Sequence, residues 1–485
     1  MRDIYLEVGE SYYISEEYSF SPSKHYPEYP WTSDTIQHNQ NNVYDMVRNC
    51  LIGLELDKEN IGNRNWNPFK KLISEGNMVL LKPNWVMHVN GNKKVNEHAL
   101  DCLVTNPSVV RAICDYCIIA LKGTGKIIIG DAPMQGCDLQ ELLNETGYNK
   151  MLDFYKQIGT EVQFCDFREY RSVFDRNKVI IDKEFTGQTC IEVELGNNSM
   201  HYSKDSIKQY QVSDYEKELT KKYHQNEKHS YSINQNILQA DVIINICKPK
   251  CHRLAGITGA LKNVVGITYN KACLPHRTIG SKEEGGDEYL KKSYIKKLIS
   301  LVLSQKVKYE KENKLKCALL MRYIYGGLYY WVKFFKKDKN LIGSWYGNDT
   351  IWRTVLDLNY ILKYADKNGI INNKEQRKTF NFADMIIAGQ GNGPVSPEPK
   401  QIGVIIAGNN PVVLDRVICE IMGFDYLKIP GLLNAIHSTK LMSKSLENCY
   451  VESNISEYCG AVDKICFSKE WDFCPHDSWK GHIEK

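Results

Sequence analysis

Residues 240–266 read ADVIINICKPKCHRLAGITGALKNVVG and place a polar cluster directly after an apolar strand. The run from Asp241 to Ile246 is rich in β-branched residues, which is typical of a strand covered on both faces in a parallel sheet. In such a sheet, ligands bind beyond the carboxyl ends of the strands, because loops and helix amino termini converge there. This stretch therefore predicts an α/β fold and the position of its ligand site.

Further strand–helix units occur on both sides of this stretch. The clearest strands are Met78–Leu81, Lys126–Ile129 and Glu161–Cys165, and the pattern returns at Ala383–Ala388 and Ile402–Ala407. We predict an α/β fold of two α/β portions with mainly parallel sheets, a helical, Lys-rich insertion, and a ligand cleft at the strand carboxyl ends. The predicted boundaries are an irregular N-terminal arm at 1–74, a first α/β portion at 75–280, the helical insertion at 281–375, and a second α/β portion with a C-terminal tail at 376–485.

Composition narrows the class of protein. The 485 residues include 62 Lys and Arg against 58 Asp and Glu, a net charge of +4, which argues against nucleic acid as a partner. The amino terminus carries acidic residues where a signal peptide needs an apolar core. Sixteen cysteines in a chain that is not secreted indicate reduced thiols. We therefore expect a cytoplasmic protein.

The candidate catalytic residues are Lys248, Lys250 and His252, which occupy alternate positions after the strand. If the extended conformation continues, the three side chains point the same way. Clustered cations lower one another's pKa, and a lysine removed from water can act as a base or a nucleophile. His252 or one of these lysines would then handle a proton. A solvated basic loop is the alternative interpretation.

Residues after the other strands complete the candidate site. Lys262 and Asn263 lie near an expected helix start, where backbone N–H groups favour a phosphate or a carboxylate. Asp131 either caps a helix or binds a metal or the ligand. Arg353 either pairs with Asp357 on one helix face or grips an anionic substrate. The predicted substrate-binding residues are Lys82, Asn84, Asp131, Lys262, Asn263, His276, Arg353, Gly391, Asn392 and Gly393.

The segment Ala318–Phe335 reads ALLMRYIYGGLYYWVKFF and is apolar and aromatic. It contains Arg322 and Lys333, and it just misses the length and low charge of a membrane-spanning helix. A basic, aromatic helix of this kind suits a membrane interface, which makes peripheral membrane contact one interpretation. The other is a buried or groove-lining helix whose long cations reach water.

Together these loops resemble the domain of unknown function 362 family. The matching pieces are Leu80–Asn84, Thr105–Pro107, Ile129–Asp131, Ala240–Lys250 with His252, Gly259–Asn263, Trp345–Asn359, Ile387–Pro394 and Asn410–Asp415. The family carries no general activity. Some relatives look like fusions to ferredoxin-type cysteine motifs, which this chain lacks, so redox work would need a separate electron donor. The Trp345–Asn359 block resembles members found beside polysaccharide-synthesis genes, which implies surface polysaccharide metabolism.

A second resemblance is to the lactate racemase fold, in which a glycine-rich turn with lysine precedes a histidine. Here Gly259–Lys262 and His276 would correspond to that pair. The resemblance implies a two-portion α/β fold with the ligand in the cleft, and nothing in the sequence indicates a nickel cofactor.

We expect an enzyme that binds an anionic small molecule in a cleft lined by lysine and histidine. A carboxylate, a phosphate or a nucleotide-linked sugar would fit, while the reaction and any cofactor stay open. One alternative is a non-catalytic, membrane-peripheral binding protein that docks through Ala318–Phe335. Another is a metal or redox protein using Cys247, Cys251 and His252; apart from that alternative, we predict no metal ligands.

Overall fold

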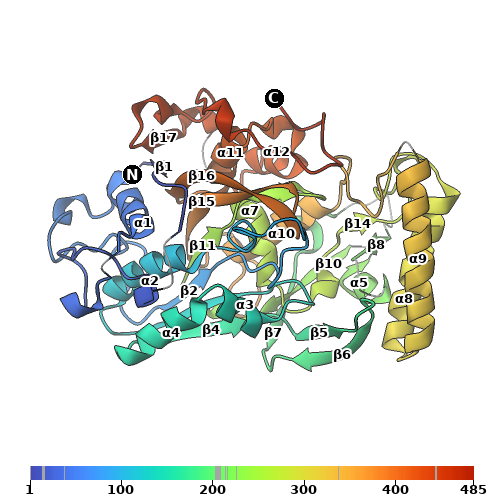
Figure 1. The fold of residues 1–485 in the computed structure, drawn as a ribbon, viewed down its shortest axis with the longest axis horizontal. Coiled ribbons are helices and arrows are strands. Elements are labelled where there is room, and N and C mark those ends of the chain that lie inside the picture. Colours follow the sequence, from blue (N-terminus) through green and yellow to red (C-terminus); the bar gives the residue numbers. More distant parts are fainter. Residues whose placement is uncertain are drawn as a thin grey trace.

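The computed structural model describes residues 2–13, 17–37, 39–202, 209–212, 215, 217–225, 227–336, 338–442 and 445–485. In this part of the chain, eleven strands form one central sheet (Figure 1). They are β1 (Ile4–Val8), β2 (Met78–Lys82), β3 (Lys126–Asp131), β4 (Val162–Asp166), β11 (Val242–Cys247), β12 (Lys250–His252), β13 (Gly256–Thr258), β15 (Lys378–Asn392), β16 (Ser396–Gly408), β17 (Tyr450–Ser453) and β18 (Gly460–Ala461).

The strand order is β18-β17-β1-β16-β15-β11-β2-β3-β4, with β12 and β13 beside β15. Pairing is parallel from β15 through β11, β2 and β3 to β4. It is antiparallel where β16 pairs with β15 and β1. The parallel half therefore presents the ends of β2, β3 and β11 at one edge, where a ligand site is expected.

Both faces of the central sheet carry apolar side chains that pack into hydrophobic cores. On β2, Val79 and Leu81 enter one hydrophobic core and Leu80 enters another, as the two-residue repeat of a strand requires. The first face is covered by α1 (Asn42–Gly53), α2 (Pro107–Leu121), α3 (Leu139–Glu145) and α4 (Tyr148–Gln157). The other face is covered by α6 (Gln235–Gln239), α7 (Ala260–Asn263), α10 (Ile351–Tyr364), α11 (Pro411–Ile421) and α12 (Pro430–Ile436). Cover on both faces explains why these strands read as continuous apolar runs.

Smaller elements surround the central layer. A three-stranded sheet consists of β7 (Cys190–Glu194), β10 (Lys228–Asn234) and β9 (His224–Gln225). Two two-stranded sheets pair β8 (Tyr210–Gln211) with β14 (Arg277–Thr278), and β5 (Tyr170–Phe174) with β6 (Ile180–Phe185). A short helix, α5 (Lys217–Tyr223), also belongs to this group. Two long helices, α8 (Tyr294–Lys311) and α9 (Leu315–Phe335), pack side by side at one end of the molecule (Figure 1). Within the described ranges, no helix is long and apolar enough to cross a membrane.

The predicted α/β class with a mainly parallel sheet is confirmed. The six predicted strands coincide with β2, β3, β4, β11, β15 and β16. Because β15 and β11 pair directly, the two expected α/β portions share one sheet. The expected N-terminal arm contributes β1, which lies between β16 and β17. The segment boundaries themselves stay a prediction.

Candidate functional site

Lys82 and Asp131 form a buried ion pair where β2 and β3 end. The Lys82 amine lies 2.8 Å from Asp131 Oδ1 and donates to the Pro83 carbonyl at 3.0 Å. Asp131 Oδ2 accepts the backbone N–H of Trp85 at 2.6 Å, which orders the loop after β2. Gly266 passes close to the pair, and a Cβ there would overlap Asp131 Oδ1. The pair therefore forms part of the floor of the site.

A chain of side-chain amides joins this floor to Lys250. Asn84 Nδ2 donates to Asn263 Oδ1 at 2.7 Å, and Asn263 Nδ2 donates to Asn245 Oδ1 at 2.8 Å. The Lys250 side chain is fully buried, and its amine donates to Asn84 Oδ1 at 2.5 Å. Burial, and next the neighbouring Lys248, lower the pKa of Lys250 to about 7. Lys250 therefore holds the Asn84 side chain in place through this hydrogen bond.

The helix expected after Gly259 is α7, but a carboxylate already occupies its first N–H groups. Asp415 of α11 accepts the backbone N–H of Ala260 at 2.5 Å and that of Leu261 at 3.0 Å. Gly259 permits this approach, because a Cβ there would overlap Asp415 Oδ1. The prediction that these N–H groups bind the substrate anion is therefore wrong. They instead fix the short helix that carries Lys262.

A cavity of about 200 Å³ opens above the floor. Of the residues that the structure describes, three cationic ones line it, Arg253, Lys262 and Lys271, against one carboxylate, Asp131. Since Asp131 is already paired with Lys82, the described lining carries an excess of positive charge. Among the described residues, the Lys262 amine has no hydrogen-bond or ion-pair partner. The lining therefore favours an anionic occupant that would pair with Lys262.

Burial lowers the pKa of both lysines in the cavity. The pKa of Lys262 falls to about 7, and the nearby Lys271 is the second cause. Lys271 donates to the Ala132 carbonyl at 2.7 Å, and its pKa falls to about 8, because burial outweighs the opposing attraction of Asp131. Both side chains are partly exposed to the cavity. An anion that entered it would raise both pKa values and restore the full charge.

Two histidines line the cavity with opposite hydrogen-bonding roles. His252 Nδ1 accepts the N–H groups of Leu254 and Ala255, each at 3.1 Å, so the ring proton is assigned to Nε2. His276 Nδ1 lies 2.6 Å from the Leu274 carbonyl and donates to it, which leaves Nε2 as an acceptor. Burial lowers the pKa of His276 to about 3 and that of His252 well below its ordinary value. The cavity thus has one histidine N–H donor and one unprotonated histidine nitrogen that accepts hydrogen bonds.

Six of the predicted site residues line this cavity: Asn84, Asp131, His252, Lys262, Asn263 and His276. Lys248 lies elsewhere, because its amine pairs with Asp384 Oδ2 at 3.0 Å and donates to the Tyr13 hydroxyl at 2.5 Å. The expected common direction of Lys248, Lys250 and His252 is therefore wrong. The strand stops at Cys247 and resumes at Lys250, so strict alternation is lost.

Arg353 is also away from the cavity. Its guanidinium pairs with Asp349, with Nη2 and Oδ2 3.0 Å apart, and donates to the Met200 carbonyl at 2.7 Å. The expected ion pair with Asp357 is therefore replaced by one with Asp349, and Asp357 accepts the Tyr231 hydroxyl at 2.9 Å. Arg353 therefore anchors α10 to a neighbouring loop, and the substrate-gripping role is not supported.

The glycine-rich turn at 391–393 reaches the cavity only through the residues that follow it. Asn392 Nδ2 donates to Asp477 Oδ2 at 3.0 Å, and Gly391 donates its N–H to the Cys474 carbonyl at 2.8 Å. Pro394 and Val395 line the cavity wall. The turn between β15 and β16 thus shapes the wall, and its polar groups bind the C-terminal tail.

The cysteine–histidine alternative does not assemble into a ligand set. Cys251 Sγ donates to the Cys474 carbonyl at 3.3 Å, and burial raises the pKa of its thiol to about 12. Cys247 is fully buried, and burial raises its pKa well above the ordinary value. His252 Nδ1 is occupied by backbone N–H groups. In the described residues, no group of three or more His, Cys, Asp or Glu side chains is arranged to hold a metal ion.

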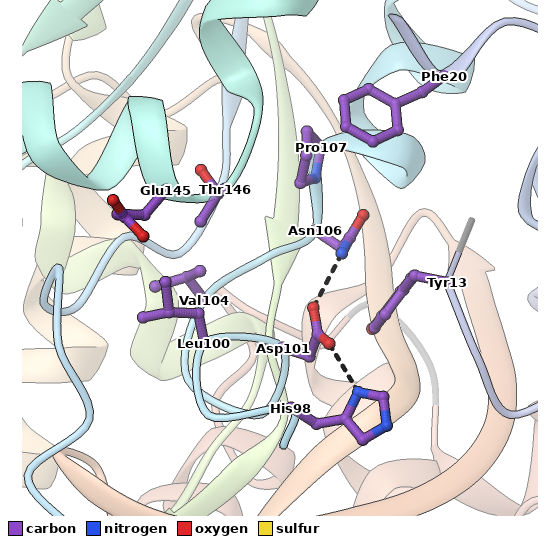
Figure 2. A pocket seen from close by; sticks show the side chains of 10 residues that line it. All are labelled: Tyr13, Phe20, His98, Leu100, Asp101, Val104, Asn106, Pro107, Glu145 and Thr146. Atoms are coloured by element: carbon purple, nitrogen blue, oxygen red, sulfur yellow. Dashed lines mark hydrogen bonds and ion pairs between the residues drawn. The ribbon is translucent and has the colours of Figure 1, made fainter. Parts of the chain in front are cut away.

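A second cavity of about 230 Å³ lies near the amino end of α2 (Figure 2). Asp101 accepts from His98 Nδ1 at 2.9 Å and from Asn106 Nδ2 at 3.1 Å, and both contacts are drawn in Figure 2. Tyr13 also lines this cavity, and its hydroxyl contacts Lys248. No lysine or arginine lines it in the described part of the chain, and the carboxylates Asp101 and Glu145 make it less suited to an anion than the first cavity.

Arg253 and Lys271 line the first cavity but were not predicted from the sequence. Arg253 follows His252 directly, and the assumption of alternating positions excluded it. Because the chain turns between β12 and β13, that assumption does not hold there. Lys271 lies nine residues after Lys262, and this spacing between two lysines is the signal that could have identified it.

Comparisons with known proteins identify the family of this chain but indicate no reaction. A family model described as "Domain of unknown function (DUF362)" matches residues 79–195 and 197–420. No curated protein matches the chain significantly. A crystal structure of a protein from Thermotoga maritima aligns at 12% identity and a TM-score of 0.26, over 74% of this chain and 54% of that one. This chain thus spans about half the length of that protein, and the alignment is too weak to indicate a shared fold.

Proposed function

Because the chain belongs to the domain of unknown function 362 family, whose description names no reaction, we propose a function from the site itself. The protein is an enzyme that binds a small anionic substrate in the cavity beyond β2, β3 and β11. One observation carries this proposal: the partly buried Lys262 amine has no partner among the described residues, in a cavity that Arg253 and Lys271 also line. The resemblance to the lactate racemase fold is not confirmed and does not enter it.

The arrangement suits proton transfer on the bound substrate. His276 Nε2 is an unprotonated hydrogen-bond acceptor, since its Nδ1 donates to the Leu274 carbonyl, and its low pKa leaves neutral Lys262 as the candidate base. His252 Nε2–H is the candidate donor to an oxygen that gains negative charge. A pKa of about 7 gives Lys262 comparable charged and neutral populations near neutral pH. Lys262 is therefore a basic group in the empty cavity, and a bound anion would raise its pKa so that it takes up a proton from solvent.

The size and charge of the cavity point to the substrate class. A space of about 200 Å³ holds a carboxylate or phosphate group with a few carbons. A nucleotide-linked sugar would place only one charged end inside and extend the rest into solvent. Sugar phosphates and nucleotide-linked sugars belong in the first test, because the Trp345–Asn359 block resembles members associated with polysaccharide synthesis.

The test is a thermal-shift screen against carboxylates, inorganic phosphate, sugar phosphates and nucleotide-linked sugars. A ligand at 100 times its dissociation constant stabilises a protein by about 2.7 kcal/mol. We expect one anionic class to stabilise the wild type and to lose its effect in Lys262→Gln. Lys126→Gln is the matched control, because Lys126 begins β3 at the opposite end from Asp131. Equal stabilisation of the wild type and Lys262→Gln, or none of any anion, would contradict the proposal.

A further inference from the structure

The helices α8 and α9 form a hairpin that packs on a small core of its own. Ile299 of α8, Val332 of α9 and Leu341 form the buried centre of this core. In α9, only Ala318 and Val332 are buried among its 21 residues. At about 1.5 Å per residue, the helix is about 30 Å long. One face of the helix packs along α8, while another face has no cover from the described part of the chain (Figure 1).

The uncovered face of α9 is apolar at helical spacing. Positions 320, 323, 324, 327, 330, 331 and 334 follow the i, i+3, i+4, i+7 pattern of one helix face. The large residues on it are strongly exposed: Leu320 (56%), Tyr323 (63%), Ile324 (38%), Tyr330 (59%), Trp331 (42%) and Phe334 (75%). Phe335 beside them is 74% exposed. A continuous apolar stripe of this extent on one helix indicates a binding surface.

The charges of α9 have a single sign. The helix contains Lys316, Arg322 and Lys333 and no acidic residue, and Lys336 follows its last turn. Lys316, Lys333 and Lys336 are exposed, and the Lys336 amine lies 5.3 Å from the centre of the Trp331 ring. Tyrosine and tryptophan prefer the headgroup layer of a bilayer, where lysine can also reach anionic lipids.

We propose that α9 docks on a membrane that contains anionic lipids, with the helix lying in the plane of the interface. The proposal goes beyond the proposed function and does not depend on it. No helix of the described chain can span a bilayer, so α9 would lie on the surface. A second copy of the chain is a poorer occupant, because two α9 faces would bring lysines together without any acid of α9 to pair with them.

The test is vesicle co-sedimentation of the full chain. Vesicles are made of phosphatidylcholine alone or with about one third phosphatidylglycerol. We expect binding to the anionic vesicles, weaker at about 1 M salt, where screening shortens to about 3 Å. The double variant Trp331→Ser/Phe334→Ser should bind at least about ten-fold more weakly, since affinity follows buried apolar area. Phe185→Ser is the matched control, because Phe185 is 70% exposed on β6, and it should bind like the wild type.

Thermal unfolding of each variant shows that it remains folded. Three outcomes would overturn the proposal: equal vesicle binding by the double variant and the wild type, no binding of the wild type to anionic vesicles, or dimerisation of the wild type that the double variant loses without any vesicle binding. Sedimentation velocity detects the last of these. Anion binding in the cavity is measured separately with Lys262→Gln, so failure of either proposal leaves the other intact.

Discussion

At the scale of single residues, Lys250 combines complete burial with a basic group. Its amine donates to Asn84 Oδ1, and no carboxylate of the described chain forms an ion pair with it. Burial lowers its pKa from 10.5 to about 7, so the fold favours the neutral amine. The unfolded chain binds the proton first, and stability is lost as the pH falls from about 10.5 to about 7.

We therefore predict that Lys250→Met gains stability over the wild type as the pH is lowered from about 10 to 7. The gain should grow by about 1.4 kcal/mol per pH unit and level off below pH 7. Urea unfolding of both proteins at pH 7, 8 and 9 measures it. Lys248→Met is the control and should lose about 3 kcal/mol, because it leaves Asp384 buried without its cation. If the free energies of unfolding of Lys250→Met and the wild type change in parallel with pH, the Lys250 amine stays charged in the folded protein.

The sequence predicted which residues lie near the site better than it predicted where their side chains point. Lys262 reached the cavity because it closely follows the end of a central strand, which a sequence pattern can show. Lys248 did not, because its direction depends on the partner Asp384, which lies 136 residues away in the chain. Such long-range pairs leave no local signal in one sequence.

At the scale of secondary-structure elements, α7 depends on a cap from another helix. Asp415 of α11 accepts the N–H groups of Ala260 and Leu261, and α7 holds Lys262 at the cavity. We predict that Asp415→Ala lowers the free energy of unfolding by about 2 kcal/mol, because two buried donors lose their acceptor. Anion affinity should fall as well, since Lys262 loses its support. Urea unfolding and calorimetric titration measure the two effects.

Asp415→Asn is the control for this prediction. Its amide keeps one oxygen acceptor, so it should lose less stability than the alanine variant. A stable Asp415→Ala protein with unchanged anion affinity would mean that α7 is held by packing alone. The sequence could predict the helix start at Gly259, but the cap from Asp415 belongs to a strand–helix unit that only the fold brings near.

At the scale of the whole molecule, the central sheet joins segments from both ends of the chain. Residues Ile4–Val8 pair with β16 on one side, and Ile4–Leu6 pair with β17 on the other. The pattern of the first 74 residues is weakly periodic, and a five-residue strand in it could not be separated from irregular chain. The pairing of β15 with β11 then connects this half to β2 and β3. The sheet should therefore unfold as one unit.

Leu6→Ala tests this unity. Leu6 is fully buried on β1, so its truncation should cost about 2–5 kcal/mol. If the sheet unfolds as one unit, amide hydrogen exchange should accelerate in β2 and β11 as much as in β16, although neither β2 nor β11 pairs with β1. Tyr450→Ala on the neighbouring β17 is the control, because Tyr450 is 54% exposed and its loss should change little. Faster exchange confined to β16 and β17 would instead mean that the two expected α/β portions unfold independently.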